Sequence, residues 1–252
     1  MIKLILKIFP RTFLIKFSFI FQPLLSLLLR GDKFTDPIDG KSFRKFLSYG
    51  YNESRKNALS PSTLSLERHR LLWLYLINET VLFERKVKLL HFAPEQAFYT
   101  RFKKLNNIQY DSIDINSPLA KIKADICDLP IKDNTYDFIL CNHVLEHVLD
   151  DNKAMSELYR ITKTNGIGLC LVPIMLSLDK SLENKEYLQT EDLRWKYFGQ
   201  DDHVRMYSKN DFITRLERVG FKVEQYGQEF FGKDVFESLG LDKKSILYVV
   251  EK

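Results

Sequence analysis

The chain has 252 residues, of which 45% are hydrophobic, 28% charged and 13% aromatic. This composition excludes disordered, collagen-like and disulfide-scaffold proteins. The formal net charge is +5, and five basic residues lie without any acidic residue in the first thirty positions, so the rest of the chain is neutral. Because a nucleic-acid-binding domain carries its basic residues as a stripe on a folded surface, we expect no nucleic-acid partner.

The three cysteines, Cys127, Cys141 and Cys170, lie in separate apolar stretches without close spacing. This spacing argues against a disulfide framework and against a thiolate metal cluster. We therefore expect a protein of a reducing compartment, the cytoplasm.

Residues 1–30 are rich in Leu, Ile and Phe, but their longest uncharged run, 17–29, has only thirteen residues and contains a proline. A helix of that length spans about 20 Å, short of the roughly 30 Å hydrocarbon core of a bilayer. Lys3, Lys7 and Arg11 would form one basic stripe beside an apolar face, which is typical of a helix lying in a membrane interface. The alternative is an amphipathic helix docked on its own domain or on a second subunit. The segment thus predicts either peripheral contact with the inner face of the membrane or a protein contact.

The rest of the chain predicts an α/β fold. Residues 31–62 are polar and turn-rich, and residues 64–82 form a Leu, Trp and Tyr pattern that predicts a helix capped by Ser62 or Thr63. Beyond Lys86, short apolar runs alternate with helical stretches, which predicts a parallel sheet with its ligand at the carboxyl ends of the strands. The expected strands are 86–92, 108–115, 121–126, 136–141, 167–172, 221–227 and 245–251, and the expected helices are 94–105, 150–163 (closed by Asn165-Gly166) and 208–220.

The segment 124–147 reads ADICDLPIKDNTYDFILCNHVLEH. It resembles the D-x-x-x-LPF-x-D-x-SFD segment and the following VLEH motif of class I S-adenosylmethionine-dependent methyltransferases, particularly the type 11 group. The resemblance implies a Rossmann-like sheet of seven strands, mostly parallel with the last strand antiparallel, after an N-terminal helical extension. It also implies S-adenosylmethionine as cofactor.

The resemblance assigns cofactor-binding roles within this segment. It implies that Asp125 accepts a hydrogen bond from the adenine amino group, that Ile126 meets the adenine ring, and that Asn142 lies near the methionine part. His143 would face the transfer region, or alternatively serve helix-end packing. Asp114, at the end of the second expected strand, can accept hydrogen bonds from both ribose hydroxyls, and its alternative role is to cap a turn.

The expected first turn departs from the family pattern. The glycine-rich E/D-x-G-x-G-x-G is replaced by LHFAPE over residues 90–95, without any glycine. A subset of type 11-like bacterial methyltransferases is similar at LHFAPE. That similarity implies His91 and Glu95 near the methionine carboxylate and amino groups. Phe92, Ala93 and Ile115 complete the expected set of cofactor-binding residues. The alternative interpretation of the glycine-free turn is that this sheet has lost the ability to bind the cofactor.

Residues 202–207, DHVRMY, resemble a polar segment of the same subset, in a region that covers the acceptor pocket of class I methyltransferases. His203, Arg205 and Tyr207 are therefore, with His143, the candidate catalytic residues for acid/base chemistry or positioning of an acceptor. The alternative for this segment is an ion-paired loop anchor.

An apparent metal site lies before residue 64. Relatives often carry a small zinc ribbon there, whereas this chain has DPIDG over 36–40 and SPST over 60–63, so every thiolate is replaced. Carboxylates and hydroxyls are poor ligands for structural zinc. We expect turns in place of the ribbon and no metal ligand in the chain.

Together these features predict an amphipathic segment over 1–30, a degenerate zinc-ribbon-like segment with a helix over 31–85, and a methyltransferase domain over 86–252. The expected activity is S-adenosylmethionine-dependent methyl transfer to a small-molecule or glycan acceptor, with a hydroxyl as one candidate acceptor group. The alternative is a non-catalytic methyltransferase-fold scaffold that associates with a membrane or a protein partner. An oxidoreductase on a similar sheet is disfavoured because the chain lacks G-x-G-x-x-G.

Overall fold

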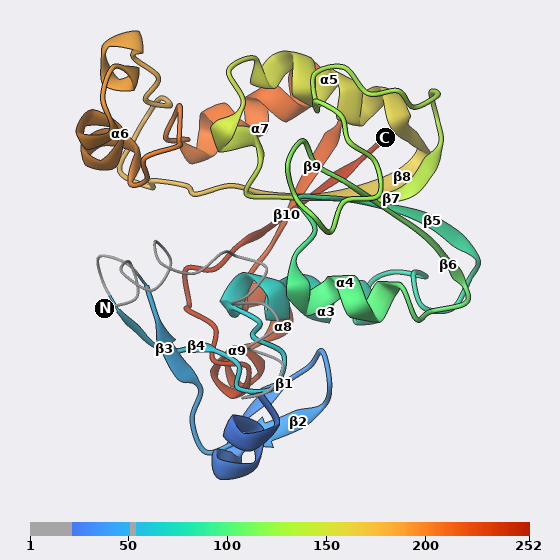
Figure 1. Cartoon of the computed structure of the whole chain (residues 1–252), viewed down its shortest axis with the longest axis vertical. Helices are drawn as coiled ribbons and strands as arrows, with labels where there is room; N and C mark the ends of the chain where they lie inside the picture. The colour runs from blue at the N-terminus through green and yellow to red at the C-terminus, as the bar shows by residue number, and fades with distance from the viewer. Residues whose placement is uncertain (1–21, 51–53) are drawn as a thin grey trace. The chain divides into compact units, whose positions relative to one another are not determined.

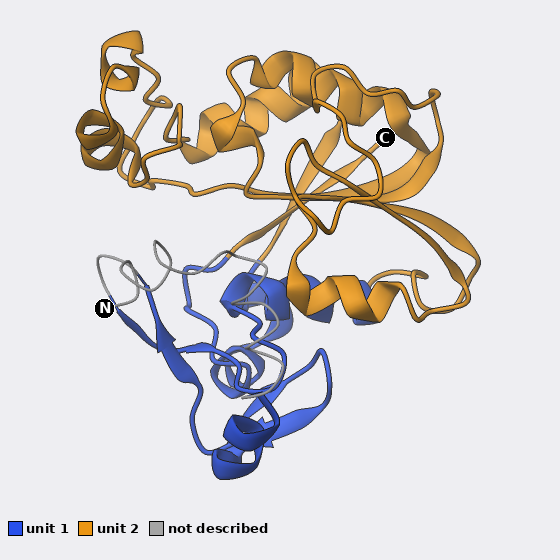
Figure 2. Cartoon of the chain, in the orientation of Figure 1, with its two compact units in different colours: residues 1–78, 227–245 blue, residues 79–226, 246–252 orange. Residues whose placement is uncertain are grey.

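A computed structural model describes residues 22–50 and 54–252. The chain divides into two compact units (Figure 2): unit 1 comprises Met1–Asn78 and Gly227–Ser245, and unit 2 comprises Glu79–Tyr226 and Ile246–Lys252. Within the described ranges, no helix is long and apolar enough to cross a membrane. Most of the amphipathic segment predicted over 1–30 lies outside the described residues, and residues 22–28 are helical.

Unit 2 is built on a six-stranded sheet with the order β6-β5-β7-β8-β10-β9. Strands β6, β5, β7 and β8 are parallel, and β10 is antiparallel to both of its neighbours. The central strands are almost continuously buried because helices cover both faces, as the apolar runs in the sequence predicted. The strands are β5 (Val87–Phe92), β6 (Ile108–Ile113), β7 (Tyr136–Asn142), β8 (Thr162–Leu171), β9 (Lys222–Tyr226) and β10 (Leu247–Glu251).

Helix α4 (Gln96–Phe102) lies on one face of this sheet, and α5 (Asp151–Ile161) and α7 (Lys209–Arg218) lie on the other (Figure 1). The start of α5 is set by Asp150, whose side chain accepts from Lys153 N, and that of α7 by Ser208. Shorter helices in unit 2 are η1 (Leu145–His147), η2 (Lys185–Leu188) and α6 (Glu191–Phe198). The predicted helix starts at 150 and 208 are thus confirmed.

The strand predicted over 121–126 is wrong, and the sheet therefore has six strands where the resemblance implied seven. Only an isolated bridge joins Ile122 to Ile113. Lys121, Lys123 and Asp125 are all exposed, so one side of this segment is polar and the segment lacks the burial on both faces that the central strands have.

The prediction that Asn165-Gly166 closes the preceding helix is also wrong. Helix α5 ends at Ile161, and β8 runs through both residues. Asn165 has φ 63°, and the pairing register with β7 shifts at this point, which indicates a bulge within the strand. A Cβ on Gly166 would lie 2.8 Å from Lys163 O, so the close backbone approach requires glycine.

Unit 1 contains two hairpins where the sequence predicted only turns. They pair β1 (Arg30–Asp36) with β2 (Lys41–Phe43) and β3 (Leu47–Tyr49) with β4 (Arg55–Leu59). These strands are short and largely polar, so neither their length nor their pattern distinguished them from loops. The helices of unit 1 are α3 (Glu67–Asn78), α8 (Gln228–Phe231) and α9 (Lys233–Ser238).

The cap predicted for the helix over 64–82 is wrong as well. Helix α3 begins at Glu67, and its first turn is stabilised by the Leu66 amide donating to His69 Nδ1 at 3.0 Å. Thr63, the predicted cap, instead donates to Asp36 Oδ2, which also accepts from Ser65 Oγ at 2.9 Å. The buried Asp36 carboxylate thus joins the turns over 36–40 and 60–63.

The guanidinium of Arg70 connects α3 to the second segment of unit 1. It donates to the carbonyls of Leu239 at 2.6 Å and Gly240 at 3.2 Å, and to those of Ala58 and Ser65. Complete burial lowers the pKa of Arg70 to about 10. The helices α8 and α9 are therefore integral to the packing of unit 1.

Candidate active site

Two polar side chains meet at the carboxyl ends of the paired strands β5 and β7. Asn142 Nδ2 donates to Glu95 Oε2 at 2.9 Å. The carbonyl oxygen of the same amide, Asn142 Oδ1, is buried and accepts no hydrogen bond from any described residue. A buried acceptor without a donor costs about 1–3 kcal/mol. The pair therefore presents acceptor oxygens suited to a cationic or N–H-bearing ligand.

His91 supports this pair from β5. Its Nε2 accepts from the Glu95 amide at 3.4 Å and lies 3.7 Å from Glu95 Oε2, and its Nδ1 lies 3.0 Å from the hydroxyl of Tyr110. Burial raises the pKa of Tyr110 far above its ordinary value, so the phenol stays neutral. The ring of His91 is fully buried and packs beside Phe98. His91 thus contacts Glu95 and positions it.

The two turns that leave β5 and β7 hold non-glycine residues in left-handed backbone conformations. Ala93 has φ 44° and His143 has φ 52°. Conformations of this kind cost about 1–3 kcal/mol each and cluster at functional sites. Ala93 is flanked by Phe92 and Pro94, both buried. The turn after β5 therefore adopts a backbone conformation that favours glycine, and alanine, the next smallest residue, occupies it.

Asp114 and Asp125, the acids expected to bind the nucleoside, each accept hydrogen bonds from backbone amides of the turn that follows them. Asp114 Oδ1 accepts from the amides of Asn116 at 2.7 Å and Ser117 at 2.5 Å, and its second oxygen makes no hydrogen bond to the described residues. Asp125 is exposed, and its Oδ1 accepts from the Cys127 amide at 2.8 Å. Each carboxylate therefore caps a turn with one oxygen and leaves the other for a ligand.

The two apolar neighbours of these acids differ in exposure. Ile115 follows Asp114 and is 58% exposed, whereas Ile126 follows Asp125 and is only 6% exposed. Ile115 thus offers the apolar surface beside Asp114.

Two of the candidate histidines, His143 and His203, lie near each other after β7, together with His147. His143 Nδ1 lies 2.9 Å from Glu146 Oε1, and the ring centroids of His147 and His203 are 4.8 Å apart. His203 is buried, and its burial lowers the pKa of the imidazole below its ordinary value. Val204 N donates to Glu146 O at 2.9 Å, which ties the 202–207 segment to η1.

Arg205 and Tyr207 are buried and belong to a polar network. The Arg205 guanidinium donates to the carbonyls of Leu145, Val148 and Leu149 and to Glu183 Oε2. The Tyr207 hydroxyl donates to Asp151 Oδ2 at 2.6 Å, and burial raises the pKa of this phenol far above its ordinary value. All of these groups hold the connection between η1 and α5, which is the arrangement of an ion-paired loop anchor.

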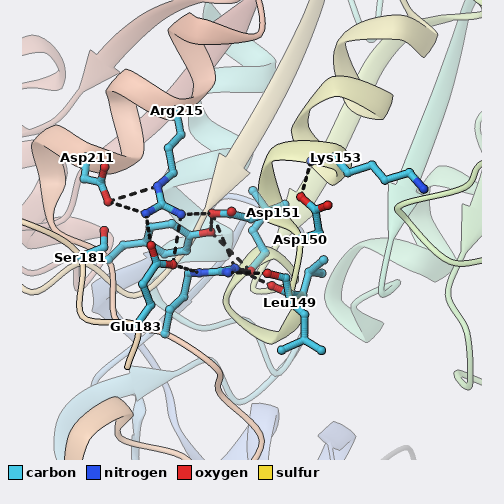
Figure 3. Close-up of polar contacts among 12 residues, drawn as sticks. Leu149, Asp150, Asp151, Lys153, Ser181, Glu183, Asp211 and Arg215 are labelled. Carbon is cyan, nitrogen blue, oxygen red and sulfur yellow. Dashed lines mark hydrogen bonds and ion pairs between the residues drawn. The ribbon is translucent and has the colours of Figure 1, made fainter. Parts of the chain in front are cut away.

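Sequence reasoning missed four members of these clusters. Glu146 lies within the VLEH motif and so had a signal, but no role was assigned to it. Asp151, Glu183 and Arg215 had none, because they come from separate segments: Arg215 Nη1 donates to Asp151 Oδ2 at 2.8 Å, and Arg215 Nη2 donates to Glu183 Oε1 at 2.5 Å (Figure 3). Only the folded chain brings them together.

Comparison with known proteins identifies the family. Residues 55–226 match the family described as methyltransferase domain. The chain belongs to this family. The six-stranded sheet with antiparallel β10 is therefore that of a class I S-adenosylmethionine-dependent methyltransferase domain. The narrower subset suggested by LHFAPE and by the degenerate zinc ribbon stays a prediction.

Two relatives of known sequence match parts of the chain. Over 146 residues the chain is 32% identical to the uncharacterized protein MJ0638 of Methanocaldococcus jannaschii, covering 56% of this chain and 57% of that one. Over 69 residues it is 38% identical to the ubiquinone/menaquinone biosynthesis C-methyltransferase UbiE of Rickettsia prowazekii, covering 27% of this chain and 28% of UbiE. The chain thus spans little more than half of the first relative and about a quarter of the second.

The fold is also similar to that of the 4+2 cyclase SpnF. The TM-score is 0.52 at 15% sequence identity, covering 85% of this chain and 89% of SpnF. This likeness shows the fold. It does not specify the reaction, because one fold hosts different chemistries.

Proposed function

We propose that this protein transfers the methyl group of S-adenosylmethionine to a hydroxyl group of a small-molecule or glycan acceptor. The observation that carries the proposal is the buried Asn142 amide, which donates to Glu95 and has an unsatisfied oxygen at the carboxyl edge of the sheet. Membership of the methyltransferase family supports the same activity.

The donor set at this edge fits the cofactor. Glu95 and Asn142 offer oxygens to the ammonium of its methionine part, and the remaining oxygens of Asp114 and Asp125 suit the ribose hydroxyls and the adenine amino group. Ile115 offers an apolar surface for the base. When bound, S-adenosylmethionine supplies an electrophilic methyl group on a sulfonium.

His143 is our candidate for acid/base work on the acceptor. Its Nδ1 faces the Glu146 carboxylate, so Nδ1 carries the proton and Nε2 presents a lone pair. A side chain that is 31% exposed can meet an acceptor. His143 Nε2 would then take the proton that a hydroxyl must lose, and the carboxylate would stabilise the resulting imidazolium. Arg205 and Tyr207 serve as positioning residues that hold the loop beside it.

Isothermal calorimetry with S-adenosylmethionine and S-adenosylhomocysteine tests the proposal. We expect the wild type to bind both. Asn142→Leu should weaken binding at least about tenfold, since it removes a donor and an acceptor from a buried site. Asn152→Leu, the same change at an exposed position of α5, is the matched control and should leave both affinities unchanged.

The opposite result would favour the scaffold alternative. If the folded wild-type protein binds neither ligand, the carboxyl edge does not hold this cofactor and the methyltransferase proposal fails. If binding is present, release of S-adenosylhomocysteine upon addition of hydroxyl-bearing and amine-bearing acceptor pools identifies the acceptor group.

We also propose that residues 1–30 form a separate contact segment ahead of a 31–85 segment and an 86–252 catalytic domain. Leu24, Leu27 and Leu28 are 52%, 69% and 59% exposed, which supports a contact with a membrane surface. Liposome flotation before and after deletion of residues 1–30 tests this contact. Unchanged flotation would exclude a membrane contact of residues 1–30 and leave the alternative, a contact with protein.

A further inference from the structure

Three side chains with metal-binding groups converge after β7. Glu146 and His147 belong to η1, His203 precedes α7, and one ligand atom of each lies within 4.8 Å of the others. Glu146 Oε2 and His203 Nε2 are buried and have no hydrogen-bond partner in the described part of the chain. The two residues are only 1% and 2% exposed. Buried polar atoms without partners are rare, so two in one cluster point to a missing ligand.

The hydrogen bonds of both imidazoles leave their Nε2 atoms able to bind a cation. His203 Nδ1 lies 3.0 Å from Phe198 O, and His147 Nδ1 lies 3.2 Å from Asp202 O. Carbonyl oxygens only accept, so each Nδ1 carries the proton and each Nε2 carries a lone pair. Backbone carbonyls fix the tautomer of metal-bound histidines in the same way.

The carboxylate of the cluster is held from its other side. Glu146 Oε1 lies 2.9 Å from His143 Nδ1, which leaves Oε2 as the oxygen directed to a further ligand. Hydrogen bonds that orient a ligating carboxylate are a usual second layer around a metal ion. Each of the three potential ligands is therefore oriented by a group outside the cluster.

Two imidazole nitrogens and one carboxylate oxygen form the ligand set of catalytic zinc sites and of non-haem iron sites. Both kinds of site keep an open position for water or substrate. The His147 side chain is 32% exposed, so solvent reaches this side of the cluster. Ligands of one tetrahedral zinc ion lie about 3.4 Å apart. The three side chains would close around an ion by rotations that shorten their longest separation, at most 4.8 Å, by up to about 1.4 Å.

We propose that Glu146, His147 and His203 bind one divalent transition-metal ion, for which Zn²⁺ is the test ion, and that this ion holds an oxygen atom of the methyl acceptor. The metal site stands on geometry alone, and only its acceptor role rests on the proposed function. A divalent cation lowers the pKa of a bound hydroxyl, which suits an acceptor that must lose a proton. Cysteine spacing could not reveal this site, because its ligands are imidazoles and a carboxylate from distant segments.

The experiment uses the full-length protein, stripped with a chelator and carrying Cys127→Ser, because Cys127 is the cysteine that is not buried. Zn²⁺ titration by calorimetry and visible absorption with Co²⁺ report stoichiometry and ligand type. We expect one ion per chain. His147→Ala, at a part-exposed position, should lower Zn²⁺ affinity at least about tenfold. Glu146→Gln should do the same, whereas Glu186→Gln at an exposed position is the matched control.

Two results would overturn the inference. One is a folded protein that binds no stoichiometric Zn²⁺ or Co²⁺, and the other is unchanged affinity in both His147→Ala and Glu146→Gln. Calorimetry with S-adenosylhomocysteine on the same samples separates the two proposals. Cofactor binding without metal binding refutes the metal site alone, and metal binding without cofactor binding refutes the methyltransferase proposal alone.

Discussion

Replacing Tyr207 with phenylalanine removes one buried hydroxyl while keeping the ring. That hydroxyl donates to Asp151 Oδ2 at 2.6 Å, and the same oxygen still accepts from Arg215 Nη1 at 2.8 Å after the change. A hydrogen bond to a charged group contributes about 1.5–3 kcal/mol. Since the carboxylate keeps its cationic partner, we expect the free energy of unfolding to decrease by about 1.5–3 kcal/mol. For a domain of this size the melting temperature should fall by about 3–12 °C.

The measurement is urea and thermal unfolding of Tyr207→Phe beside Tyr197→Phe. Tyr197 stacks on Tyr187 with ring centroids 3.7 Å apart, and its hydroxyl makes no hydrogen bond to the described residues. The control should therefore change stability by less than about 0.5 kcal/mol. Binding of S-adenosylhomocysteine should be the same in both variants, because Tyr207 acts through the loop anchor.

The result that refutes this reasoning is also specific. If Tyr207→Phe keeps wild-type stability and cofactor affinity but loses methyl transfer, the hydroxyl touches the acceptor. Tyr207 would then be a catalytic residue, and the network of Figure 3 would be part of the acceptor site.

Three other predictions concern charge and backbone conformation. A hydrogen bond from Arg160 lowers the pKa of Glu157, so this carboxylate stabilises the fold above its unfolded pKa of about 4.3 and loses the effect as pH falls through the lower folded pKa. The stability difference between wild type and Glu157→Gln should therefore be constant near neutral pH and shrink below about pH 4, and a difference that grows in acid would contradict this. Ala93→Gly should raise the melting temperature, because glycine adopts the left-handed conformation without strain, and an unchanged or lower value would show that the turn is not strained. Gly166→Ala should lower stability by about 1–3 kcal/mol through its clash with Lys163 O, as denaturant unfolding would show.

Local signals predicted most of the sheet unit correctly. The apolar runs that became β5 and β7 are buried on both faces, and Asp150 and Ser208 start their helices as side-chain caps. Such features depend on a few neighbouring residues, so one sequence is enough to recognise them.

The errors arose where tertiary contacts override local preference. Asn165-Gly166 is a common helix stop, yet here the pair forms a strand bulge because β8 must align with β7. For the site, the family resemblance pointed to Asn142 and Glu95, and a hydrogen bond joins these two side chains. The resemblance stops there. It could not show that Arg205 contacts backbone carbonyls or that Glu146 is buried beside His203, because these contacts join distant segments.

The chain leaves the sheet unit after β9, builds part of unit 1 over 227–245, and returns as β10. Unit 2 therefore cannot be isolated by trimming the N-terminus at residue 78, since α8 and α9 would then lose the Arg70 guanidinium that binds the carbonyls of Leu239 and Gly240. Because Tyr226 pairs with Leu247 in adjacent antiparallel strands, a tight hairpin turn can replace the excised loop. A minimal version of unit 2 would accordingly need deletion of residues 1–78 and 227–245 and a new turn that joins β9 to β10.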